Sequence, residues 1–327
     1  MSKLVTIYGG SGFVGRYIAR RLAKEGWRVR VAVRNPNEAL HVKPYGVVGQ
    51  VEPIFCNIRD DASVAAAMSG SDAVVNCVGT FDQSGRNNFD AVQAEGATRI
   101  ARLAAEHGVT GLVHISAIGA DSASESDSSR TKGEGEEGIL AHVPNAVILR
   151  PSVIFGAEDD FFNRFAGMSR FAPVLPLVSA DTKFQPVHVD DVAQAAVKGV
   201  LGQVNAGIYE LGGPDVHSFR ELMEQMLHII RRRRLILNLP NPVARAVAFF
   251  GGAAEFLSLG IIKQPITSDQ IKQLAHDNVV ADDAKGFAEL GIEPVAMEAI
   301  LPDYLWRFRP TGQYDAIKES AKNLRKV

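Results

Sequence analysis

Cysteine is scarce in this chain, which has only Cys56 and Cys77 among 327 residues. Both lie in apolar runs that are typical of strands, and this favours buried thiols in a reducing compartment. Two cysteines cannot build a disulfide framework, and no group of histidine, cysteine or carboxylate residues has the spacing of a metal site. We therefore expect no disulfide scaffold and no bound metal.

The sequence also lacks a strong charge imbalance and a long apolar run. Its formal net charge is −2, which gives no reason to expect binding to nucleic acid. No uninterrupted charge-free run is long enough for a convincing membrane span. A strand-like run begins by Leu4, so we expect no signal or transit peptide ahead of the fold.

The opening of the chain carries its clearest pattern: an apolar run, a cluster of glycines and then a helical pattern. Leu4–Tyr8 is typical of a buried strand, and Gly9, Gly10, Gly12 and Gly15 follow it. Glycines let a backbone approach a pyrophosphate closely, and free N–H groups at a helix start favour negative charge. The pattern predicts a dinucleotide-binding turn. The expected cofactor contacts in this turn are Gly9, Ser11, Gly12, Phe13 and Val14.

The residue after the second predicted strand, Trp27–Val33, indicates which dinucleotide binds. An NAD-binding fold usually has an acidic residue here for the ribose 2′-hydroxyl, whereas this chain has Arg34. A guanidinium can hold a 2′-phosphate through two hydrogen bonds, and an acid would repel it. Arg16 is a second candidate partner for that phosphate. We expect NADP(H), with a solvated surface arginine at position 34 as the alternative.

Predicted strands and helices alternate along the first half of the chain. The expected strands are Leu4–Tyr8, Trp27–Val33, Val51–Cys56, Ala73–Val78, Leu112–Ser116 and Ala146–Leu149, and the later helices are Asp61–Met68 and Phe89–His107. This order predicts an α/β fold with a doubly wound parallel Rossmann sheet and a smaller C-terminal α/β appendage. We place the nucleotide-binding core at residues 1–155 and the smaller region, interleaved with it, at residues 156–327.

Ligands of such sheets lie beyond the carboxyl ends of the strands. Asn57 and Ile58 are expected beside the adenine. The other candidate cofactor contacts at strand ends are Val78, Gly79, Thr80, Ser116, Pro151, Ser152 and Val153.

The glycine turn, the strand end Asn76–Gly79 and Ser116 together resemble the atypical extended short-chain dehydrogenases/reductases. Active members of that superfamily use a serine, a tyrosine and a lysine four residues after the tyrosine. The lysine lowers the pKa of the phenol, which exchanges a proton with the substrate. In this sequence Lys132 has the lysine's place, but Ser128 has the tyrosine's. The resemblance implies that Lys132 contacts the nicotinamide ribose, and a solvated lysine is the alternative.

Ser128 argues against catalysis because a serine hydroxyl is a far weaker acid than a phenol. No tyrosine lies between Tyr45 and Tyr209 to replace it. The serine-rich segment Ser122–Ser129 is expected to be a mobile loop. Ser116 could equally be a small polar residue that closes a strand. We expect no catalytic residue.

Three downstream blocks carry a narrower resemblance: Arg150–Phe165, Phe184–Ala195 and Tyr209–Leu222. Together they are similar to the Rossmann-fold accessory subunit of respiratory complex I. The resemblance implies that the chain binds NADPH without turnover, as a structural ligand. It also implies that its partners are other complex I subunits, at the junction of the peripheral and membrane arms.

The C-terminal third holds a candidate contact with a membrane surface. Four arginines, Arg231–Arg234, precede the apolar stretch Asn241–Ile262. A basic cluster followed by an apolar helix suits anionic headgroups, and the alternative is a core helix after a solvated turn. We expect a peripheral protein on the cytoplasmic face of a bacterial inner membrane, or on the matrix face if it is mitochondrial.

Two other functions remain open at this stage. The first alternative is an NADPH-dependent reductase or epimerase acting on a small or quinone-like substrate, and the second is a redox-sensing regulator. Neither gains support from His188, Asp190 and Asp191, which are typical of a strand-to-helix junction. Three glutamates, Glu134, Glu136 and Glu137, are expected only to stabilise the start of a helix through its dipole.

Overall fold

The computed structural model describes residues 2–80, 85–239, 267–312, 314 and 321. Contacts between residues divide the chain into two compact units. The first, called unit 1, comprises Met1–Ser152, Val189–Gly212 and Val280–Pro294; the second, unit 2, comprises Val153–His188, Gly213–Val279 and Val295–Val327. Each unit is therefore built from three separate segments of the chain.

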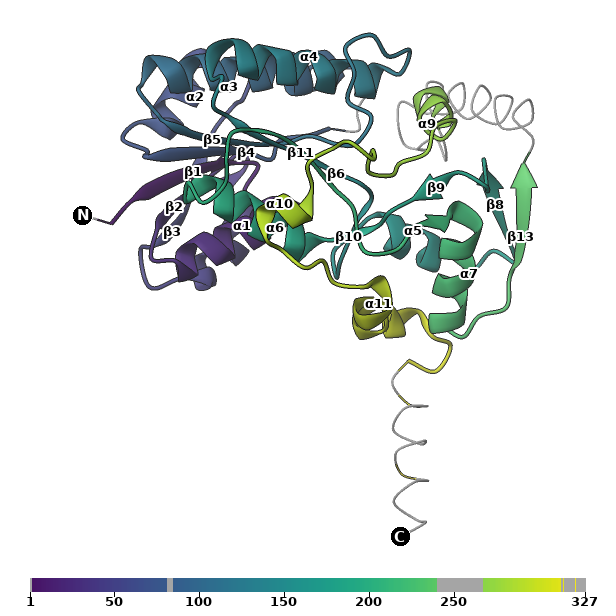
Figure 1. The fold of residues 1–327 in the computed structure, drawn as a ribbon. Helices are drawn as coiled ribbons and strands as arrows, with labels where there is room; N and C mark the ends of the chain where they lie inside the picture. Colours follow the sequence, from purple (N-terminus) through teal and green to yellow (C-terminus); the bar gives the residue numbers. More distant parts are fainter. Residues whose placement is uncertain (1, 81–84, 240–266, 313, 315–320, 322–327) are drawn as a thin grey trace. The chain divides into compact units, whose positions relative to one another are not determined.

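Unit 1 is built on a seven-stranded parallel sheet (Figure 1). Its strands are β1 (Leu4–Tyr8), β2 (Arg28–Val33), β3 (Val51–Phe55), β4 (Ala73–Asn76), β5 (Gly111–Ile115), β6 (Val147–Pro151) and β11 (Gly207–Leu211), in the order β11-β6-β5-β4-β1-β2-β3. The order reverses between β1 and β4, which makes that gap the switch point of the sheet. The expected doubly wound α/β fold is thereby confirmed.

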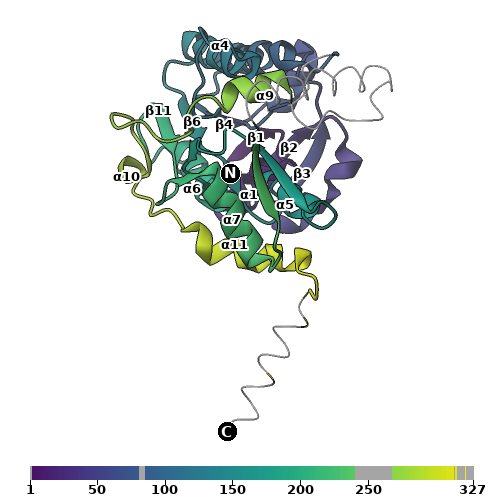
Figure 2. The same ribbon diagram turned by 90° about the vertical axis from the view of Figure 1, so that its right-hand side faces the viewer.

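Helices cover both faces of this sheet. The helices of unit 1 are α1 (Phe13–Lys24), α2 (Asp61–Met68), α3 (Glu95–Glu106), α4 (Asp127–His142), α6 (Val189–Val200) and α10 (Phe287–Leu290), with the 3₁₀ segment η1 (Pro36–Tyr45). The pair α3 and α4 packs together with α2 on one face, and α1 packs with α6 on the other (Figures 1 and 2). Because both faces are covered, the central strands are mostly apolar and buried, as in β1, where all five residues are buried.

Three elements of unit 1 differ from the sequence prediction. The edge strand β11 was not predicted, and it lies far along the chain from its neighbour β6. The predicted helix Phe89–His107 is a π-helical turn, η2 (Asp90–Ala94), followed by α3. The predicted mobile loop Ser122–Ser129 is wrong in its second half, where α4 begins at Asp127 with Ser126 as its cap.

Unit 2 has short paired strands and its own core. Its elements are β7 (Ile154–Phe155), α5 (Phe161–Met168), β8 (Val174–Val178), β9 (Lys183–Phe184), β10 (Val187–His188), β12 (His217–Ser218), α7 (Phe219–Ile229), β13 (Leu235–Leu239), α9 (Ser268–Gln273), α11 (Met297–Leu305) and η3 (Trp306–Phe308). The pairs are β10 with β7, β12 with β9, and β13 with β8. Helices α7 and α11 lie side by side (Figure 2).

Aromatic residues dominate the core of unit 2. The ring of Phe161 contacts those of Phe165, Phe184 and Phe219 at centroid distances of 5.6, 6.0 and 5.7 Å. Ser218 begins α7 with a reciprocal capping box to Glu221. Aromatic pairs in these tilted and edge-on arrangements stabilise a core beyond the area that they bury.

The structure also bears on the cysteines, on metal binding and on membrane spans. Cys56 and Cys77 are free thiols, and burial raises their pKa values to about 11 and about 12. Within the described ranges no cluster of side chains could hold a metal ion. None of the helices described is long and apolar enough to cross a membrane. The predicted membrane-contacting stretch Asn241–Ile262 lies outside the described residues.

Candidate functional site

The predicted cofactor residues gather at one edge of the sheet of unit 1. Because all seven strands are parallel, the segments that follow β1 to β6 emerge at the same edge. These segments, together with Pro151 at the end of β6, contain every sequence-predicted contact, and one of these contacts, Val153, is the first residue of unit 2.

The glycine turn is tight enough to exclude side chains. Gly9 has a φ of +73°, and a Cβ added there would lie 3.1 Å from the backbone of Cys77. A Cβ on Gly15 would lie 2.5 Å from the carbonyl oxygen of Gly9. The amide of Gly12 donates to the same carbonyl, at 3.0 Å. Glycine is therefore required for the helix to begin this close to the end of β1.

Helix α1 begins beside this turn with its amides available to an anion. Gly12 is the N-cap, and it has no side chain to accept hydrogen bonds from the first turn. The first turn also contains no acidic residue. Uncapped N–H groups and the positive end of the helix dipole favour a phosphate here. The glycine turn, which has no room for side chains, and the start of α1 together fit the pyrophosphate of a dinucleotide.

Two arginines lie near the turn and the end of β2. The guanidinium of Arg16 folds back over the turn, donating to the carbonyl oxygens of Ser11 (3.1 Å) and Gly12 (3.2 Å). Arg34 follows β2 directly and is exposed. Its guanidinium has no hydrogen bond or ion pair with any residue of the described ranges. The side chain of Arg34 can therefore reach a ligand without breaking a contact seen there.

The loop after β3 is held by local hydrogen bonds. The amide of Asn57 donates to the hydroxyl of Ser63 (3.0 Å), and its side-chain oxygen accepts from the amide of Arg59 (3.2 Å). The side chain of Ile58 is buried in the core and lies against Gly96 of α3. Contact between Ile58 and an adenine would therefore involve its backbone, while the side chain anchors the loop.

A buried amide–imidazole pair fixes the end of β4. The side-chain oxygen of Asn76 accepts from the amide of Val78 (3.0 Å), so its NH₂ group faces Nδ1 of His114 (3.1 Å). Nδ1 must then be the acceptor, which makes His114 a neutral imidazole protonated on Nε2. Burial, with a smaller effect from the charge of Lys132, lowers the pKa of His114 to about 4. The pair directs Val78 and the following residues into the turn after β4.

The backbone directly after this pair is open on one side. A Cβ added at Gly79 would meet no atom of the described residues within 4 Å. The carbonyl oxygen of Thr80 accepts from the side chain of Gln93 (2.9 Å), whose own side-chain oxygen accepts from Thr131 of α4 (3.1 Å). Gln93 lies in the π-helical turn η2, and such turns are frequent at functional sites. It links the strand end to α4.

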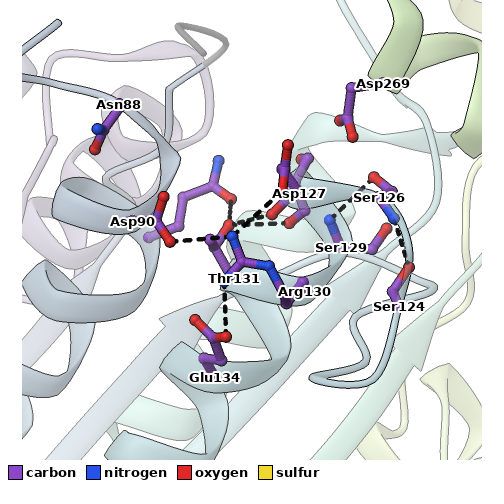
Figure 3. Close-up of polar contacts among 12 residues, drawn as sticks. Asn88, Asp90, Ser124, Ser126, Asp127, Ser129, Arg130, Thr131, Glu134 and Asp269 are labelled. Carbon is purple, nitrogen blue, oxygen red and sulfur yellow. Dashed lines mark hydrogen bonds and ion pairs between the residues drawn. The ribbon is translucent and has the colours of Figure 1, made fainter. Parts of the chain in front are cut away.

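The start of α4 is fixed by a dense set of polar contacts (Figure 3). The hydroxyl of Ser126 caps the helix by accepting from the amide of Ser129. Arg130 forms ion pairs with Asp90, Asp127 and Glu134, at 3.1, 3.3 and 2.7 Å (Figure 3). These contacts order the segment in which sequence reasoning expected mobility.

Ser128 and Lys132 lie one helical turn apart on α4. The ammonium of Lys132 donates to the hydroxyl oxygen of Ser128, with 2.8 Å between Nζ and Oγ. Ser128 is buried, and Lys132 is partly buried. The spacing of four residues, which identified this pair from the sequence, therefore places the two groups in contact.

Sequence reasoning missed the buried charge beside Ser116. Glu136, expected only to stabilise the helix dipole, is 3% exposed and pairs with Arg150 of β6 at 2.6 Å. The hydroxyl of Ser116 donates to the same carboxylate. Burial opposes the charge of Arg150, but Glu136 and Glu210 raise its pKa above the ordinary value. The only sequence signal was Arg150 at the start of the block Arg150–Phe165, which carried a family resemblance and suggested no partner for this arginine.

The ends of β6 and β10 complete the comparison with the sequence. The carbonyl of Pro151 accepts from the amide of Ile118 (3.1 Å), and the amide of Ser152 donates to Leu211 (2.9 Å). Asp190, at the start of α6, accepts hydrogen bonds from Nε and Nη2 of Arg21, each at 2.7 Å. The strand-to-helix junction predicted around His188 is confirmed, because α6 begins directly after β10.

Comparison with known proteins supports nucleotide binding and identifies related proteins. A family model described as NAD(P)H-binding matches residues 9–152. The chain is 34% identical over 320 residues to the mitochondrial NADH dehydrogenase (ubiquinone) 1 alpha subcomplex subunit 9 of Arabidopsis thaliana, covering 94% of this chain and 79% of the relative. It is 31% identical over 321 residues to the mitochondrial NADH-ubiquinone oxidoreductase 40 kDa subunit of Neurospora crassa, covering 98% and 83%.

A solved structure shows the same fold at low identity. The UDP-glucose 4-epimerase of Thermotoga maritima matches with a TM-score of 0.69 and 15% identity, covering 94% of this chain and 99% of the epimerase. At this identity the match concerns the fold alone. Identity above 30% over most of both chains, together with the nucleotide-binding model, places the chain in the family of the alpha subcomplex subunit 9, an accessory subunit of respiratory complex I.

Proposed function

We propose that the protein is an accessory subunit of respiratory complex I that holds NADPH as a structural ligand and does not turn it over. The observation that carries this proposal is the combination of the family with Ser128 at the place of the catalytic tyrosine. Both relatives are named as subunits of a ubiquinone oxidoreductase. Other subunits of that complex are therefore the proposed partners.

The cofactor is NADPH in preference to NADH. An exposed guanidinium directly after β2 suits the 2′-phosphate, and the sequence has no acidic residue at that position to repel it. Arg16, which already lies over the glycine turn, adds a second positive charge nearby. A bidentate arginine–phosphate contact is among the stronger hydrogen bonds in proteins.

Unit 1 is proposed to bind the dinucleotide, and unit 2 to contact a partner. The pyrophosphate binds at the start of α1, the adenosine half lies toward β2 and β3, and the nicotinamide half lies toward β4, β5 and β6. The contacting residues are Gly9, Ser11, Gly12, Phe13, Val14, Arg34, Asn57, Ile58, Val78, Gly79, Thr80, Ser116, Lys132, Pro151, Ser152 and Val153. When bound, the nicotinamide ring could supply hydride to an acceptor.

The residues at the nicotinamide end do not support that transfer. A serine hydroxyl at position 128 is too weak an acid to protonate a carbonyl as a phenol does. Lys132 donates to that hydroxyl and has no phenol to activate. Its proposed role is a contact with the nicotinamide ribose. We therefore propose no catalytic residue in this chain.

The proposed role of the cofactor is to stabilise the folded chain. A ligand that binds only the folded chain stabilises it by RT ln(1 + [L]/Kd), which is about 2.7 kcal/mol at a hundredfold excess over Kd. NADPH would join the ends of six strands and satisfy the exposed amides of α1. A stabilised unit 1 then supports assembly at the junction of the peripheral and membrane arms.

Contact with a membrane surface is proposed for unit 2, with the protein peripheral on the cytoplasmic face of a bacterial inner membrane or the matrix face of a mitochondrial one. Burial and the charges of Arg234 and Arg170 lower the pKa of Arg232, which places these charges close together. Leu235 and Leu237 follow on β13 and are 64% and 49% exposed. Basic and apolar side chains in succession suit an anionic bilayer. Binding to anionic vesicles that is retained after Arg232→Glu and Arg233→Glu would contradict this contact.

The test of cofactor choice compares Arg34, which directly follows β2, with Arg28, the first residue of that strand. Arg34→Gln should weaken NADPH binding by about tenfold to a hundredfold, measured by calorimetry, and leave NADH binding within about threefold. Arg28→Gln, an exposed arginine at the opposite end of β2, is the matched control and should leave NADPH binding unchanged. Equal loss of NADPH affinity in both variants would contradict the role of Arg34.

The test of the accessory role uses the native membrane complex. After mild solubilisation this chain should migrate with the complex I core, and the purified chain should not oxidise NADPH with carbonyl or quinone acceptors. Free protein with acceptor-dependent oxidation would instead favour a reductase.

A further inference from the structure

A buried ion pair determines the direction of the Ser116 hydrogen bond. Arg150 engages the carboxylate of Glu136 with Nη2 to Oε2 at 2.6 Å and Nε to Oε1 and Oε2 at 3.0 and 3.1 Å. Glu210 lies 3.7 Å from the other guanidinium nitrogen. Glu136 is therefore an ionised carboxylate paired with a guanidinium that is always charged.

An ionised carboxylate can only accept hydrogen bonds. The contact between Ser116 and Glu136 must then use the single proton of the serine hydroxyl. A serine hydroxyl has one proton and two lone pairs, so Ser116 has only lone pairs left for a ligand. A carbonyl oxygen placed against Ser116 would meet lone pairs and would not be polarised.

Ser116 lies on the side of the sheet where the nicotinamide half of a dinucleotide is expected. It follows β5, which is separated from β1 only by β4 in the strand order. Its amide donates to Leu149 of β6 at 2.7 Å, which fixes its backbone at that strand end. The groups of a nicotinamide nucleotide that can donate are the carboxamide NH₂ and the ribose hydroxyls.

We propose that Ser116 is an obligate hydrogen-bond acceptor for an N–H or O–H group of the bound nucleotide, and that Glu136 is the positioning residue that enforces this direction. The inference rests on the proposed binding of NADPH. It makes the nicotinamide end of the site selective for a donor and unsuited to a carbonyl substrate, independently of Ser128. The carboxamide NH₂ is the first expected donor, and a ribose hydroxyl is the second.

Calorimetry with NADPH and its 3-acetylpyridine analogue tests the proposal, because the acetyl group keeps the carbonyl but has no N–H. The wild-type protein should bind NADPH about tenfold more tightly than the analogue, and Ser116→Ala should reduce this preference to below twofold. Ser69→Ala, an exposed serine at the end of α2, is the matched control and should keep the preference.

The variant Glu136→Gln distinguishes an effect on the direction of the Ser116 hydrogen bond from an effect on the stability of the fold. A glutamine amide can donate to Ser116 and release its proton toward the ligand, so the preference for NADPH should fall to below twofold while NADPH still binds. The melting temperature without ligand reports any structural damage from the loss of charge beside Arg150. A preference that persists in Glu136→Gln would overturn the positioning role.

The remaining outcomes identify the donor or overturn the proposal. Equal binding of both dinucleotides by the wild type, with Ser116→Ala weakening both by about tenfold, would place the donor on a ribose hydroxyl and support the acceptor role. Unchanged affinities for both dinucleotides in Ser116→Ala would overturn it. No binding of NADPH by the wild type would overturn the proposed function itself, and this inference with it.

Discussion

The ammonium group of Lys132 donates a hydrogen bond to the hydroxyl oxygen of Ser128, and 2.8 Å separates the two atoms. A phenol in the place of this hydroxyl would have its pKa lowered by the lysine and could exchange a proton. The serine hydroxyl takes up the same contact but remains a poor acid. The pair keeps the geometry of a proton relay without its acid.

This contact predicts that Ser128 contributes little to the affinity for NADPH and that Lys132 contributes more. Ser128→Ala should change the Kd for NADPH by less than about threefold, because the hydroxyl is proposed to make no ligand contact. Lys132→Met should weaken binding by about tenfold through the lost ribose contact. Calorimetry measures both, and a spectrophotometric assay at the NADPH absorbance checks turnover. Acceptor-dependent oxidation that disappears in Ser128→Ala would show that the serine carries chemistry after all.

The second prediction concerns the close approach of α1 to the glycine turn. Gly15→Ala would place a Cβ 2.5 Å from the carbonyl oxygen of Gly9, and relieving this overlap must displace backbone. We expect a loss of about 1–3 kcal/mol in the free energy of unfolding and at least tenfold weaker NADPH binding. Urea denaturation and calorimetry measure the two effects.

Gly167→Ala provides the matched control for this substitution. Gly167 lies within α5 of unit 2, and its added Cβ would lie 3.9 Å from the nearest atom, the ring of Phe308. Alanine is favoured over glycine in a helix interior, so the variant should be neutral or more stable. Intact NADPH binding by Gly15→Ala would mean that the turn does not hold the pyrophosphate.

Local patterns predicted six of the seven strands of the sheet because burial on both faces makes these strands mostly apolar. The run Leu4–Tyr8 was placed without error, and β2 to β6 were placed to within two residues at most ends. The contact between Ser128 and Lys132 was also accessible, because four residues make one helical turn. Features encoded within about ten residues were therefore predictable.

Contacts between residues that are distant in the sequence could not be predicted. In the sequence Glu136 looks like any glutamate early in a helix, but it lies in the middle of α4, and its burial depends on Arg150, which reaches it from β6. The order of the segment after Ser122 depends in the same way on Asp90, which pairs with Arg130 across forty positions of sequence. Chemistry that arises from tertiary pairing leaves no periodic signal along the chain.

The third prediction is a pH dependence of stability that originates in His114. Its pKa is lowered to about 4 in the folded chain, against about 6.5 in an unfolded one. The unfolded state therefore binds more protons between these values, so stability is full above about pH 6.5 and falls as the pH drops toward 4. The loss from this residue between pH 7 and pH 5 should be about 2 kcal/mol.

Urea denaturation at the two pH values checks this prediction, with fluorescence of Trp27 in a Trp306→Phe background reporting on unit 1. His114→Gln should reduce the difference in unfolding free energy between pH 7 and pH 5 by about 2 kcal/mol relative to the wild type. His107→Gln, which removes an exposed imidazole, is the control and should leave that difference unchanged. An unaltered pH dependence in His114→Gln would mean that this histidine does not titrate differently on folding.

The fourth prediction tests how α11 is attached to unit 2. The hydroxyl of Tyr304 donates to the buried carboxylate of Asp159 at 2.5 Å, and that carboxylate also accepts from the amides of Gly156 and Asn163, each at 3.1 Å. Burial raises the pKa of Asp159 in spite of these donors. Removing the phenol hydroxyl leaves a buried carboxylate with one donor fewer, which costs more than a surface hydrogen bond.

Tyr304→Phe should therefore lower the stability of unit 2 by about 2 kcal/mol while its ring keeps its place in the apolar core. Trp306 lies two residues away, so its fluorescence in a Trp27→Phe background follows the unfolding of this unit alone. Tyr45→Phe is the control, because the hydroxyl of Tyr45 has no hydrogen bond with any residue of the described ranges. If the two tyrosine variants unfold at the same urea concentration, the contact with Asp159 does not hold α11 in place.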